Sequence, residues 1–392
     1  MLTLTKPFSL ATNLSCSICK KEYSLHAVNN FATCCNQPLV VDYDLPGIVA
    51  KSKLISAQNT MWRYAAVLPV LDKKNIVSLG EGMTPIFSMH KIADRFGFAD
   101  LVIKDESFNP TGSFKARGIS VAVSKAKELG IEKCIIPTAG NAGGALAAYC
   151  AKADIKCTVV MPTHTPAVFK QECTLYGAEV ILVDGLINDC AKKAAELNKD
   201  NDYFDMSTLK EPYRLEGKKT MGYEIAEQLN WQLPDVIIYP AGGGTGLIGI
   251  WKAFKEMKTM GWITGPLPRM IAVQSKNCSP ILHALKDREN WKTMFTPTAT
   301  IANGLAVPYP FGMNMILQVL VESGGTAVAI SEDEILNGVR EIAKTEGLLI
   351  SPEGAATWKA LLQLTQQKII DPQERVLLLN TGTGYKYLEN II

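Results

Sequence analysis

Lys115 stands where a protein can do chemistry on a carbonyl group. It follows the turn-forming run Asn109-Pro110-Thr111-Gly112 and falls in the first turns of a predicted helix. Backbone N–H groups at a helix N-terminus are unpaired, and the helix dipole is positive there. A lysine held in such a place, out of bulk water, has a depressed pKa and can attack a carbonyl to form an imine. A phosphate-bearing aldehyde suits this position, because a helix N-terminus favours anions.

Taken alone, a lysine at this spacing is more often a solvated residue on an amphipathic helix. The rest of the sequence favours chemistry, because two further segments offer backbone N–H groups at predicted helix N-termini. The first segment, Thr138-Ala139-Gly140-Asn141, follows the apolar run Cys134–Pro137 and suits a carboxylate. An ordinary N-cap is the alternative for Asn141.

The second segment is Ala241-Gly242-Gly243-Gly244-Thr245-Gly246, between an apolar run and a predicted helix. Consecutive glycines let several N–H groups converge on one anion, which predicts a phosphate site. The competing interpretation is a dinucleotide fingerprint, which expects an acidic residue after the next strand. That strand, Met270–Val273, is followed by Gln274 and Ser275 instead, so the dinucleotide interpretation is disfavoured.

Short apolar runs that alternate with helical-length segments must position these groups. This order predicts an α/β fold with parallel sheets covered by helices on both faces. Two predicted helices are Ala142–Ala153 and Glu332–Lys344. The predicted strands are Leu101–Lys104, Cys134–Pro137, Cys157–Met161, Val180–Val183, Val236–Tyr239, Met270–Val273, Ala327–Ile330 and Val376–Leu379.

The bulk properties exclude several classes of protein. A chain of 392 residues with net charge +2 indicates an ordinary globular protein of two or three domains, with no nucleic-acid partner. No apolar run approaches the roughly 18 residues that a membrane helix needs. The first residues lack the pattern of a secretory signal, and six of the ten cysteines lie in apolar or helical patterns. These features predict reduced thiols and a cytoplasmic location.

The other four cysteines lie near the N-terminus, as Cys16-Ser17-Ile18-Cys19 and the adjacent pair Cys34-Cys35. A C-x-x-C followed by a second pair is typical of a zinc ribbon. Adjacent thiolates do not easily take two corners of one tetrahedron, although His26 offers a replacement ligand. A zinc ribbon and a metal-free remnant of one both stay open, and no metal ligand is assigned.

Asn109-Pro110-Thr111-Gly112-Ser113-Phe114-Lys115 resembles the cofactor-lysine motif of the fold-type II pyridoxal-phosphate enzymes, and of the threonine synthases in particular. Ser78–Pro85 is similar to the segment that precedes this motif in threonine synthases. Further matches follow in the family's order at 138–144, 214–217, 241–246 and 380–386. The resemblance covers roughly residues 10 to 390.

The resemblance implies a function and a set of roles. It implies a lyase that binds pyridoxal 5'-phosphate (PLP) and converts O-phospho-L-homoserine and water to L-threonine and phosphate. Lys115 would hold the cofactor and then act as the base, and Thr381 would face the pyridine nitrogen. A hydroxyl there favours elimination and replacement over transamination. The implied cofactor-binding residues are Phe114, Lys115, Asn141, Gly242, Gly243, Gly244, Thr245, Gly246 and Thr381. The implied substrate-binding residues are Thr84, Thr138, Ala139, Gly140 and Arg214.

The sequence departs from the threonine synthase pattern at several positions. Ala116 follows the lysine where aspartate is common, and Gly243 and Gly246 stand in a loop that usually carries asparagines. Leu209 and Ala142 replace polar residues. Together these changes thin the set of groups expected to bind a substrate phosphate. A threonine or serine dehydratase, or another β-elimination or β-replacement enzyme, is therefore the alternative. A surface salt bridge is the alternative for Arg214.

The resemblance also implies an architecture of two three-layer α/β domains with the cofactor in the cleft between them. We expect an N-terminal segment at 1–45, a large PLP-binding domain from 46–122 and 210–392, and a small α/β domain at 123–209. The family suggests a homodimer whose partner molecule is an amino-acid substrate. A degenerate binding paralogue is disfavoured, because Lys115 and Thr381 are both present.

Overall fold

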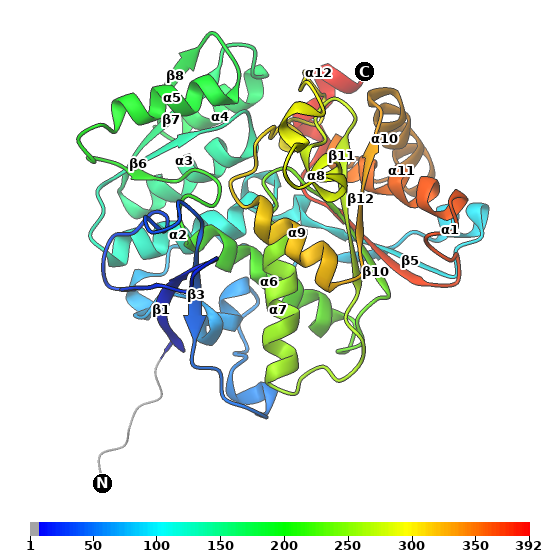
Figure 1. Ribbon diagram of the computed structural model, residues 1–392, viewed down its shortest axis with the longest axis horizontal. Helices are drawn as coiled ribbons and strands as arrows, with labels where there is room; N and C mark the ends of the chain where they lie inside the picture. Colours follow the sequence, from blue (N-terminus) through cyan, green and yellow to red (C-terminus); the bar gives the residue numbers. More distant parts are fainter. Residues whose placement is uncertain (1–7) are drawn as a thin grey trace.

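The computed structural model describes residues 8–392, which form two α/β units and a small N-terminal sheet (Figure 1). The N-terminal sheet is antiparallel, in the order β2-β1-β3, with β1 at Ala11–Cys16, β2 at Glu22–Tyr23 and β3 at Leu39–Tyr43. Its buried side chains are few, and they include Leu14 and Val41.

The smaller α/β unit is built on a parallel sheet in the order β8-β7-β6-β9. Alternate residues of its strands face opposite sides. Cys134 and Val159 pack with α3, whereas Ile135 and Val160 pack with Cys190 of α5. Strands buried on both faces explain the continuous apolar runs of the sequence. The elements are β6 (Lys133–Pro137), β7 (Lys156–Pro162), β8 (Glu179–Val183), β9 (Phe204–Asp205), α3 (Asn141–Ala153), α4 (Ala167–Leu175) and α5 (Ile187–Leu197).

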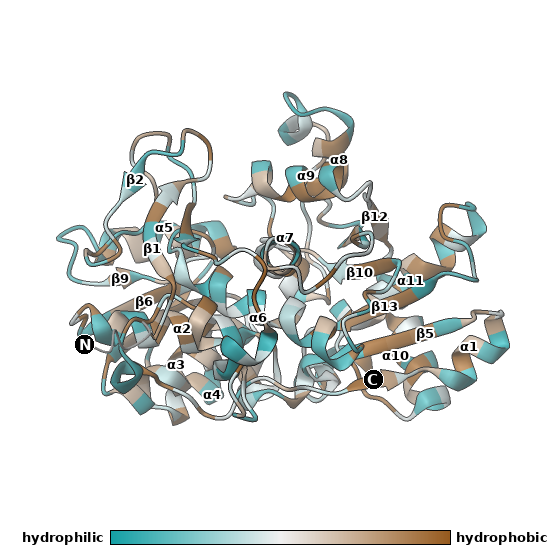
Figure 2. Cartoon of the chain, turned by 90° about the horizontal axis from the view of Figure 1, so that it is seen from below, coloured by the Kyte–Doolittle hydropathy of each residue, from teal (hydrophilic) through white to brown (hydrophobic). Residues whose placement is uncertain are grey.

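The larger unit is built on a sheet in the order β12-β11-β10-β13-β5-β4, in which only the edge pair β4–β5 is antiparallel. One face packs on α6 (Tyr213–Gln228), α7 (Thr245–Thr259) and α9 (Met313–Glu322), and the other on α10 (Glu332–Glu346) and α11 (Pro352–Gln366). Figure 2 shows the apolar colouring of β5 and β13 between these layers. The strands are β4 (Ile86–Ser88), β5 (Asp100–Asp105), β10 (Val236–Pro240), β11 (Arg269–Ser275), β12 (Thr326–Ile330) and β13 (Arg375–Asn380).

The helices of the larger unit include α2, which also packs on α3 of the smaller unit. They are α1 (His90–Phe96), α2 (Lys115–Glu128), α6 (Tyr213–Gln228), α7 (Thr245–Thr259), α8 (Pro280–Lys286), α9 (Met313–Glu322), α10 (Glu332–Glu346), α11 (Pro352–Gln366) and α12 (Leu388–Ile391). Short 3-10 helices are η1 (Lys51–Lys53), η2 (Met61–Val67), η3 (Lys73–Asn75), η4 (Glu106–Phe108), η5 (Pro110–Gly112), η6 (Trp291–Thr293), η7 (Asn303–Leu305) and η8 (Gly384–Tyr387). Across residues 8–392, none of the helices has the length and apolar character needed to cross a membrane.

The predicted α/β class is confirmed, and each predicted strand falls on an observed one. The predicted helices Ala142–Ala153 and Glu332–Lys344 correspond to α3 and α10. The start of α10 is fixed by a capping box. The Ser331 hydroxyl accepts from the Glu334 N–H, and the Glu334 carboxylate accepts from the Ser331 N–H.

A buried ionic network holds the start of α2 against the large sheet and α6. Arg117 is fully buried and ion-pairs with Glu106 of η4 and Glu224 of α6. Lys104 of β5 also pairs with Glu224, at 3.0 Å. Because Arg117 lies only two residues after Lys115, this network fixes the backbone that presents Lys115.

Candidate active site

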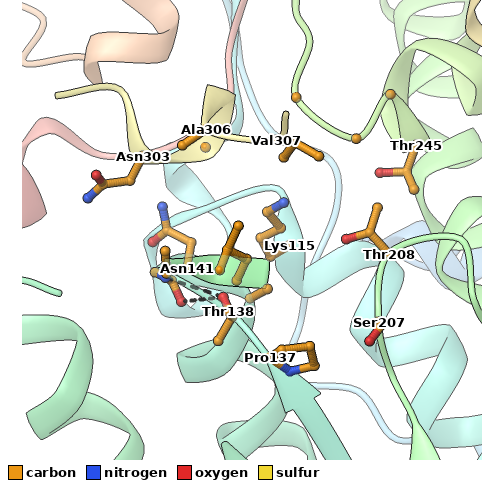
Figure 3. Close-up of a pocket in the computed structure, with 18 of the residues that line it drawn as sticks. Lys115, Pro137, Thr138, Asn141, Ser207, Thr208, Thr245, Asn303, Ala306 and Val307 are labelled. Carbon is orange, nitrogen blue, oxygen red and sulfur yellow. Dashed lines mark hydrogen bonds between the residues drawn. The ribbon is translucent and has the colours of Figure 1, made fainter. Parts of the chain in front are cut away.

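A cavity of about 300 Å³ opens where the carboxyl ends of strands from both sheets face each other. Ligands in parallel α/β folds bind at this edge of the sheet. Figure 3 shows the Lys115 side chain projecting into this space, with Thr208 and Thr245 on one side and Asn303 on another. The predicted site residues that line it are Phe114, Lys115, Thr138, Ala139, Gly140, Asn141, Gly242, Gly243, Gly244, Thr245 and Thr381.

Lys115 is the first residue of α2, as predicted from the turn that precedes it. Thr111 in that turn takes a left-handed conformation, with φ of 60°. The Phe114 N–H then donates to the Thr381 carbonyl at 3.0 Å, which ties the start of α2 to the end of β13. Burial and the nearby Arg214 guanidinium lower the pKa of Lys115 to about 7, and Glu353 opposes this shift. Near neutral pH a large share of Lys115 is therefore the nucleophilic free amine.

The glycine loop runs from β10 into α7. Gly244 has φ of 77°, in the left-handed region that favours glycine. Gly243 lies so close to Thr208 that a Cβ there would be 2.5 Å from the threonine methyl group. The loop therefore brings bare backbone to the cavity at the N-terminus of α7, where N–H groups lack helical partners. This arrangement suits a phosphate. Gly246 lies beyond the cavity wall, against the Tyr239 hydroxyl.

The loop Thr138–Asn141 runs from β6 into α3 and faces the glycine loop across the cavity. The Gly140 N–H donates to the Thr138 hydroxyl at 3.2 Å, which holds the turn. The Asn141 amide nitrogen donates to the Tyr387 hydroxyl at 3.2 Å. Asn141 is thus the first residue of α3, and its side chain forms part of the cavity wall.

Several residues at the cavity were not identified from the sequence. Tyr387 donates to Glu353 at 3.0 Å and so links that carboxylate to Asn141. Glu353 stands in the first turn of α11, after Ser351 and Pro352, and also accepts from the Gly304 N–H at 2.7 Å. The Ser-Pro-Glu start of a helix was the available signal, but it is common at N-termini without function. The cavity also has Lys210 in its wall.

Two predicted substrate-binding residues lie outside the cavity wall. Arg214 is buried in α6, where it donates to the Met206 carbonyl and lies 3.9 Å from the carboxylate of Glu211. Thr84 is buried in the ionic network, where it donates to Glu106 at 2.7 Å and accepts from Arg117 at 3.2 Å. The surface salt bridge that was the alternative for Arg214 does not describe it either, because this guanidinium is 2% exposed.

The cavity fits a phosphate-bearing aldehyde that reacts with Lys115. Three polar atoms of its wall are buried and have no hydrogen-bond partner within residues 8–392, namely Asn141 Oδ1, Asn303 Nδ2 and Glu353 Oε2. Buried polar groups normally have partners, so these atoms indicate a polar ligand. An amine of depressed pKa can bond the aldehyde of PLP, and a glycine loop at a helix N-terminus can bind its phosphate.

Comparison with known proteins agrees with this class of site. The chain matches the model of the pyridoxal-phosphate dependent enzyme family over residues 77–382 and belongs to that family. Solved structures with the same fold include maize serine racemase, with a TM-score of 0.66 and 21% identity over 78% of this chain and 92% of that one. A serine racemase from Dictyostelium discoideum has a TM-score of 0.63 and 23% identity over 76% and 92%. At these identities the likeness shows the fold.

The most informative relatives are curated threonine synthases. The chain is 36% identical to the one from Methanocaldococcus jannaschii, covering 95% of this chain and 92% of the relative. It is 34% identical to the one from Methanosarcina acetivorans, over 97% and 93%. It is 33% identical to the one from Bacillus sp. (strain ULM1), over 83% of this chain and 89% of the relative.

Two substitutions are expected to move the pKa of Lys115 in opposite directions. Arg214 lowers this pKa, so Arg214→Gln should raise it, whereas Glu353 raises it, so Glu353→Gln should lower it. The rate at which the cofactor-free protein bonds PLP should rise with pH through about 7 in the wild type. The midpoint should shift to higher pH in Arg214→Gln and to lower pH in Glu353→Gln.

The measurement is the initial rate of Lys115–PLP bond formation by absorbance across pH. PLP titrates identically in every experiment, so differences between variants belong to the protein. Arg269→Gln is the matched control, because it removes an arginine that pairs with Glu374 at the start of β11, away from the cavity. Shifts of the same sign in both test variants would contradict the electrostatic origin of the low pKa.

Proposed function

We propose that this protein is a PLP-dependent lyase that converts O-phospho-L-homoserine and water to L-threonine and phosphate. The observation that carries the proposal is the similarity to threonine synthases, which extends over 95% of the chain at 36% identity. It includes the segment that places Lys115 in the cavity. In the overall reaction the Cγ–O bond breaks, phosphate leaves, and water supplies the hydroxyl at Cβ.

The proposal gives roles to the residues at the cavity wall. Lys115 would bond the aldehyde carbon of the cofactor, and the loop Gly242–Thr245 at the start of α7 would hold its phosphate. Asn141 would contact a ring substituent, Thr381 would face the pyridine nitrogen, and Phe114 would pack near the ring. The predicted residue Gly246 supports this loop from behind, through its close approach to Tyr239.

When bound, PLP supplies an electron sink that acidifies the Cα proton of an amino acid. The protein residues then handle protons and position. Lys115, with a pKa near 7, takes the Cα proton and returns it at neutral pH. The N–H groups of the loop Thr138–Asn141 hold the substrate carboxylate at the start of α3. Glu353 and Tyr387 orient Asn141 through the hydrogen bonds described above.

Lys210 is proposed to take the role at the substrate phosphate that the family resemblance gave to Arg214. Lys210 lines the cavity together with Ser207 and Thr208, in the segment between β9 and α6. An ammonium group beside two hydroxyls is a chemically suitable partner for a phosphate. Arg214 and Thr84 lie outside the cavity wall. Arg214 still acts on the site, because it lowers the pKa of Lys115.

The test is turnover of purified PLP-loaded protein with O-phospho-L-homoserine, with phosphate and threonine measured together. We expect both products to rise in step. Phosphate without threonine, or neither product while threonine or serine yields a 2-oxo acid, would overturn the proposal. The latter outcome would support a dehydratase.

Lys210→Ala should raise KM for the phosphorylated substrate by about 10-fold or more, because a charge-assisted contact contributes about 1.5–3 kcal/mol. Lys210→Arg keeps the positive charge and should recover most of the affinity. Homoserine, which lacks the phosphate, is the control ligand. Its inhibition constant should be nearly the same in wild type and Lys210→Ala. An equal loss for both ligands would contradict a phosphate contact.

A dehydratase is the second candidate because Arg214 lies behind the cavity wall. With that guanidinium engaged by the Met206 carbonyl and Glu211, the substrate phosphate would depend on Lys210 and the hydroxyls beside it. A smaller substrate such as threonine or serine needs no such group. Parallel assays of both substrates on one preparation separate the two candidates.

The remaining expectations concern organisation. We propose the division into an N-terminal segment at 1–45, a large domain from 46–122 with 210–392, and a small domain at 123–209. The two distinct sheets, β8-β7-β6-β9 and β12-β11-β10-β13-β5-β4, support this division. We also propose a cytoplasmic homodimer, on the basis of the family resemblance and the reduced cysteines.

A further inference from the structure

The four N-terminal cysteines come together at one point. The Sγ atoms of Cys16, Cys19, Cys34 and Cys35 all lie within 4.8 Å of one another. Those of Cys19 and Cys34 are 3.4 Å apart, and all four are free thiols. Four thiolates bound to one zinc ion at about 2.3 Å lie about 3.8 Å from each other. The cluster therefore has the dimensions of a single tetrahedral site.

The first pair lies in a turn of defined geometry. The Cys16 N–H donates to the Lys21 carbonyl at 2.9 Å, and the Lys20 N–H donates back to the Cys16 carbonyl at 3.2 Å. Lys20 has φ of 63°. The turn thus runs Cys16-Ser17-Ile18-Cys19-Lys20-Lys21, with its left-handed residue directly after the second cysteine.

The second pair lies in a turn of the same kind. The Ala32 N–H donates to the Gln37 carbonyl at 2.8 Å, and Asn36 has φ of 49°. Aligned on these features, Cys35 occupies the position of Cys19, and Ala32 occupies the position of Cys16. The fourth thiol comes from Cys34 instead, one residue before Cys35. This turn answers the geometric objection to an adjacent pair, because both sulfur atoms reach the cluster.

The surroundings also indicate a metal. The sheet β2-β1-β3 and its loops form a unit of fewer than about 40 residues, a size that usually needs a metal or disulfides for stability. Its buried apolar side chains, which include Leu14, Leu25 and Leu39, belong to a core cluster shared with the α/β units, so the unit has no separate core of its own. Cys19 and Cys34 are exposed, unlike the buried cysteines of the α/β units. Exposed thiols in van der Waals contact are otherwise prone to oxidation.

We propose that Cys16, Cys19, Cys34 and Cys35 bind one structural Zn²⁺ ion. The four thiols lose their protons on binding, which gives the site a net charge of −2 beside Lys20 and Lys21. No open position is left for substrate, as is usual for structural zinc with four thiolates.

The zinc would fix the segment between the two turns against the cavity. Asn30, next to the second turn, donates to the Asp205 carbonyl at 2.9 Å. The Phe31 ring lies 5.7 Å from that of Phe311, edge to face, and Phe311 lines the cavity. In Figure 1 this N-terminal part lies beside both the smaller unit and α7.

The test is the zinc content of the full-length PLP-loaded protein, purified with a reducing agent after growth in zinc-supplemented medium. We expect about one equivalent per chain, and a thiolate-to-metal absorption band after exchange for Co²⁺. Cys16→Ser and Cys35→Ser should each lose most of the zinc. They should also be cleaved faster by protease within residues 24–33. Cys278→Ser, a buried cysteine of the larger unit, is the matched control and should keep the metal.

Wild-type protein without zinc under these conditions would overturn the proposal, and so would a Cys19–Cys34 disulfide found by mass spectrometry in that preparation. Equal zinc in Cys16→Ser and Cys278→Ser would place the metal elsewhere and overturn it too. If a cysteine variant fails to fold, the wild-type content and the Co²⁺ spectrum still decide. Because no substrate is used, failure of the proposed function leaves this result unchanged.

Discussion

Lys115→Ala should lower kcat by about 10³-fold or more, because it removes both the bond to the cofactor and the base, and general acid–base catalysis alone contributes about 10²–10⁴-fold. The fold should survive, since the side chain ends in a cavity rather than in a packed core. PLP should still bind through the glycine loop, without the absorbance of the lysine bond. The measurement combines steady-state turnover with the absorbance spectrum of the loaded protein.

Lys218 is the demanding control for this prediction. Burial and the neighbouring charge of Lys115 lower the pKa of Lys218 well below its usual value. Its Nζ is engaged, however, by the Phe114 carbonyl, and the residue does not line the cavity. Borohydride reduction makes the bond between PLP and its lysine permanent, and peptide mapping should therefore find the cofactor on Lys115. Labelling of Lys218 in the wild type would contradict the assignment of Lys115 as the cofactor lysine.

The parts of the site that the sequence predicted are those built by local rules. Lys115, Asn141 and the loop Gly242–Thr245 each follow a buried strand and open a helix, so strand–turn–helix patterns locate them. The carboxyl ends of parallel strands meet at one edge, which brings these segments together. Glycine at position 244 is explained by its positive φ, a requirement that the sequence also signals.

The residues that the sequence missed depend on contacts between distant segments. Glu353 and Tyr387 are linked to each other and to Asn141, which lies more than 200 positions earlier in the chain. Nothing in the local pattern at the start of α11 distinguishes Glu353 from an ordinary residue in the first turn of a helix. Arg214 illustrates the same limit, because the family resemblance located its segment but not the direction of its side chain.

The N-terminal cysteines illustrate a different limit. Spacing alone suggested that adjacent cysteines are poor ligands for one ion. The turn that replaces the expected first cysteine with Ala32 becomes evident only from the backbone hydrogen bond to Gln37. Short strands such as β2 and β9, each of two residues, were also missed, since they are too short for a periodic pattern.

Arg117→Met should lower the free energy of unfolding by about 3–5 kcal/mol, because it leaves buried carboxylates without their main cation. Arg117 donates to both Glu106 and Glu224, and all three side chains are fully buried. Lys104 still pairs with Glu224 but makes no such contact with Glu106. The measurement is urea unfolding followed by circular dichroism at pH 7.

The pH dependence separates a charge effect from a packing effect. Burial alone would raise the pKa of Glu224, but Arg117 and Lys104 lower it to about 2, and the pKa of Glu106 is lowered for similar reasons. Carboxylates with lowered folded-state pKa stabilise the protein above the unfolded pKa of about 4.3, and this stability is lost as pH falls toward 2. The difference between wild type and Arg117→Met should therefore shrink below about pH 4.5. Arg117→Lys keeps a positive charge but loses the forked guanidinium, so it should lose less stability than Arg117→Met. A difference between Arg117→Met and wild type that stays constant with pH would assign the loss to packing instead.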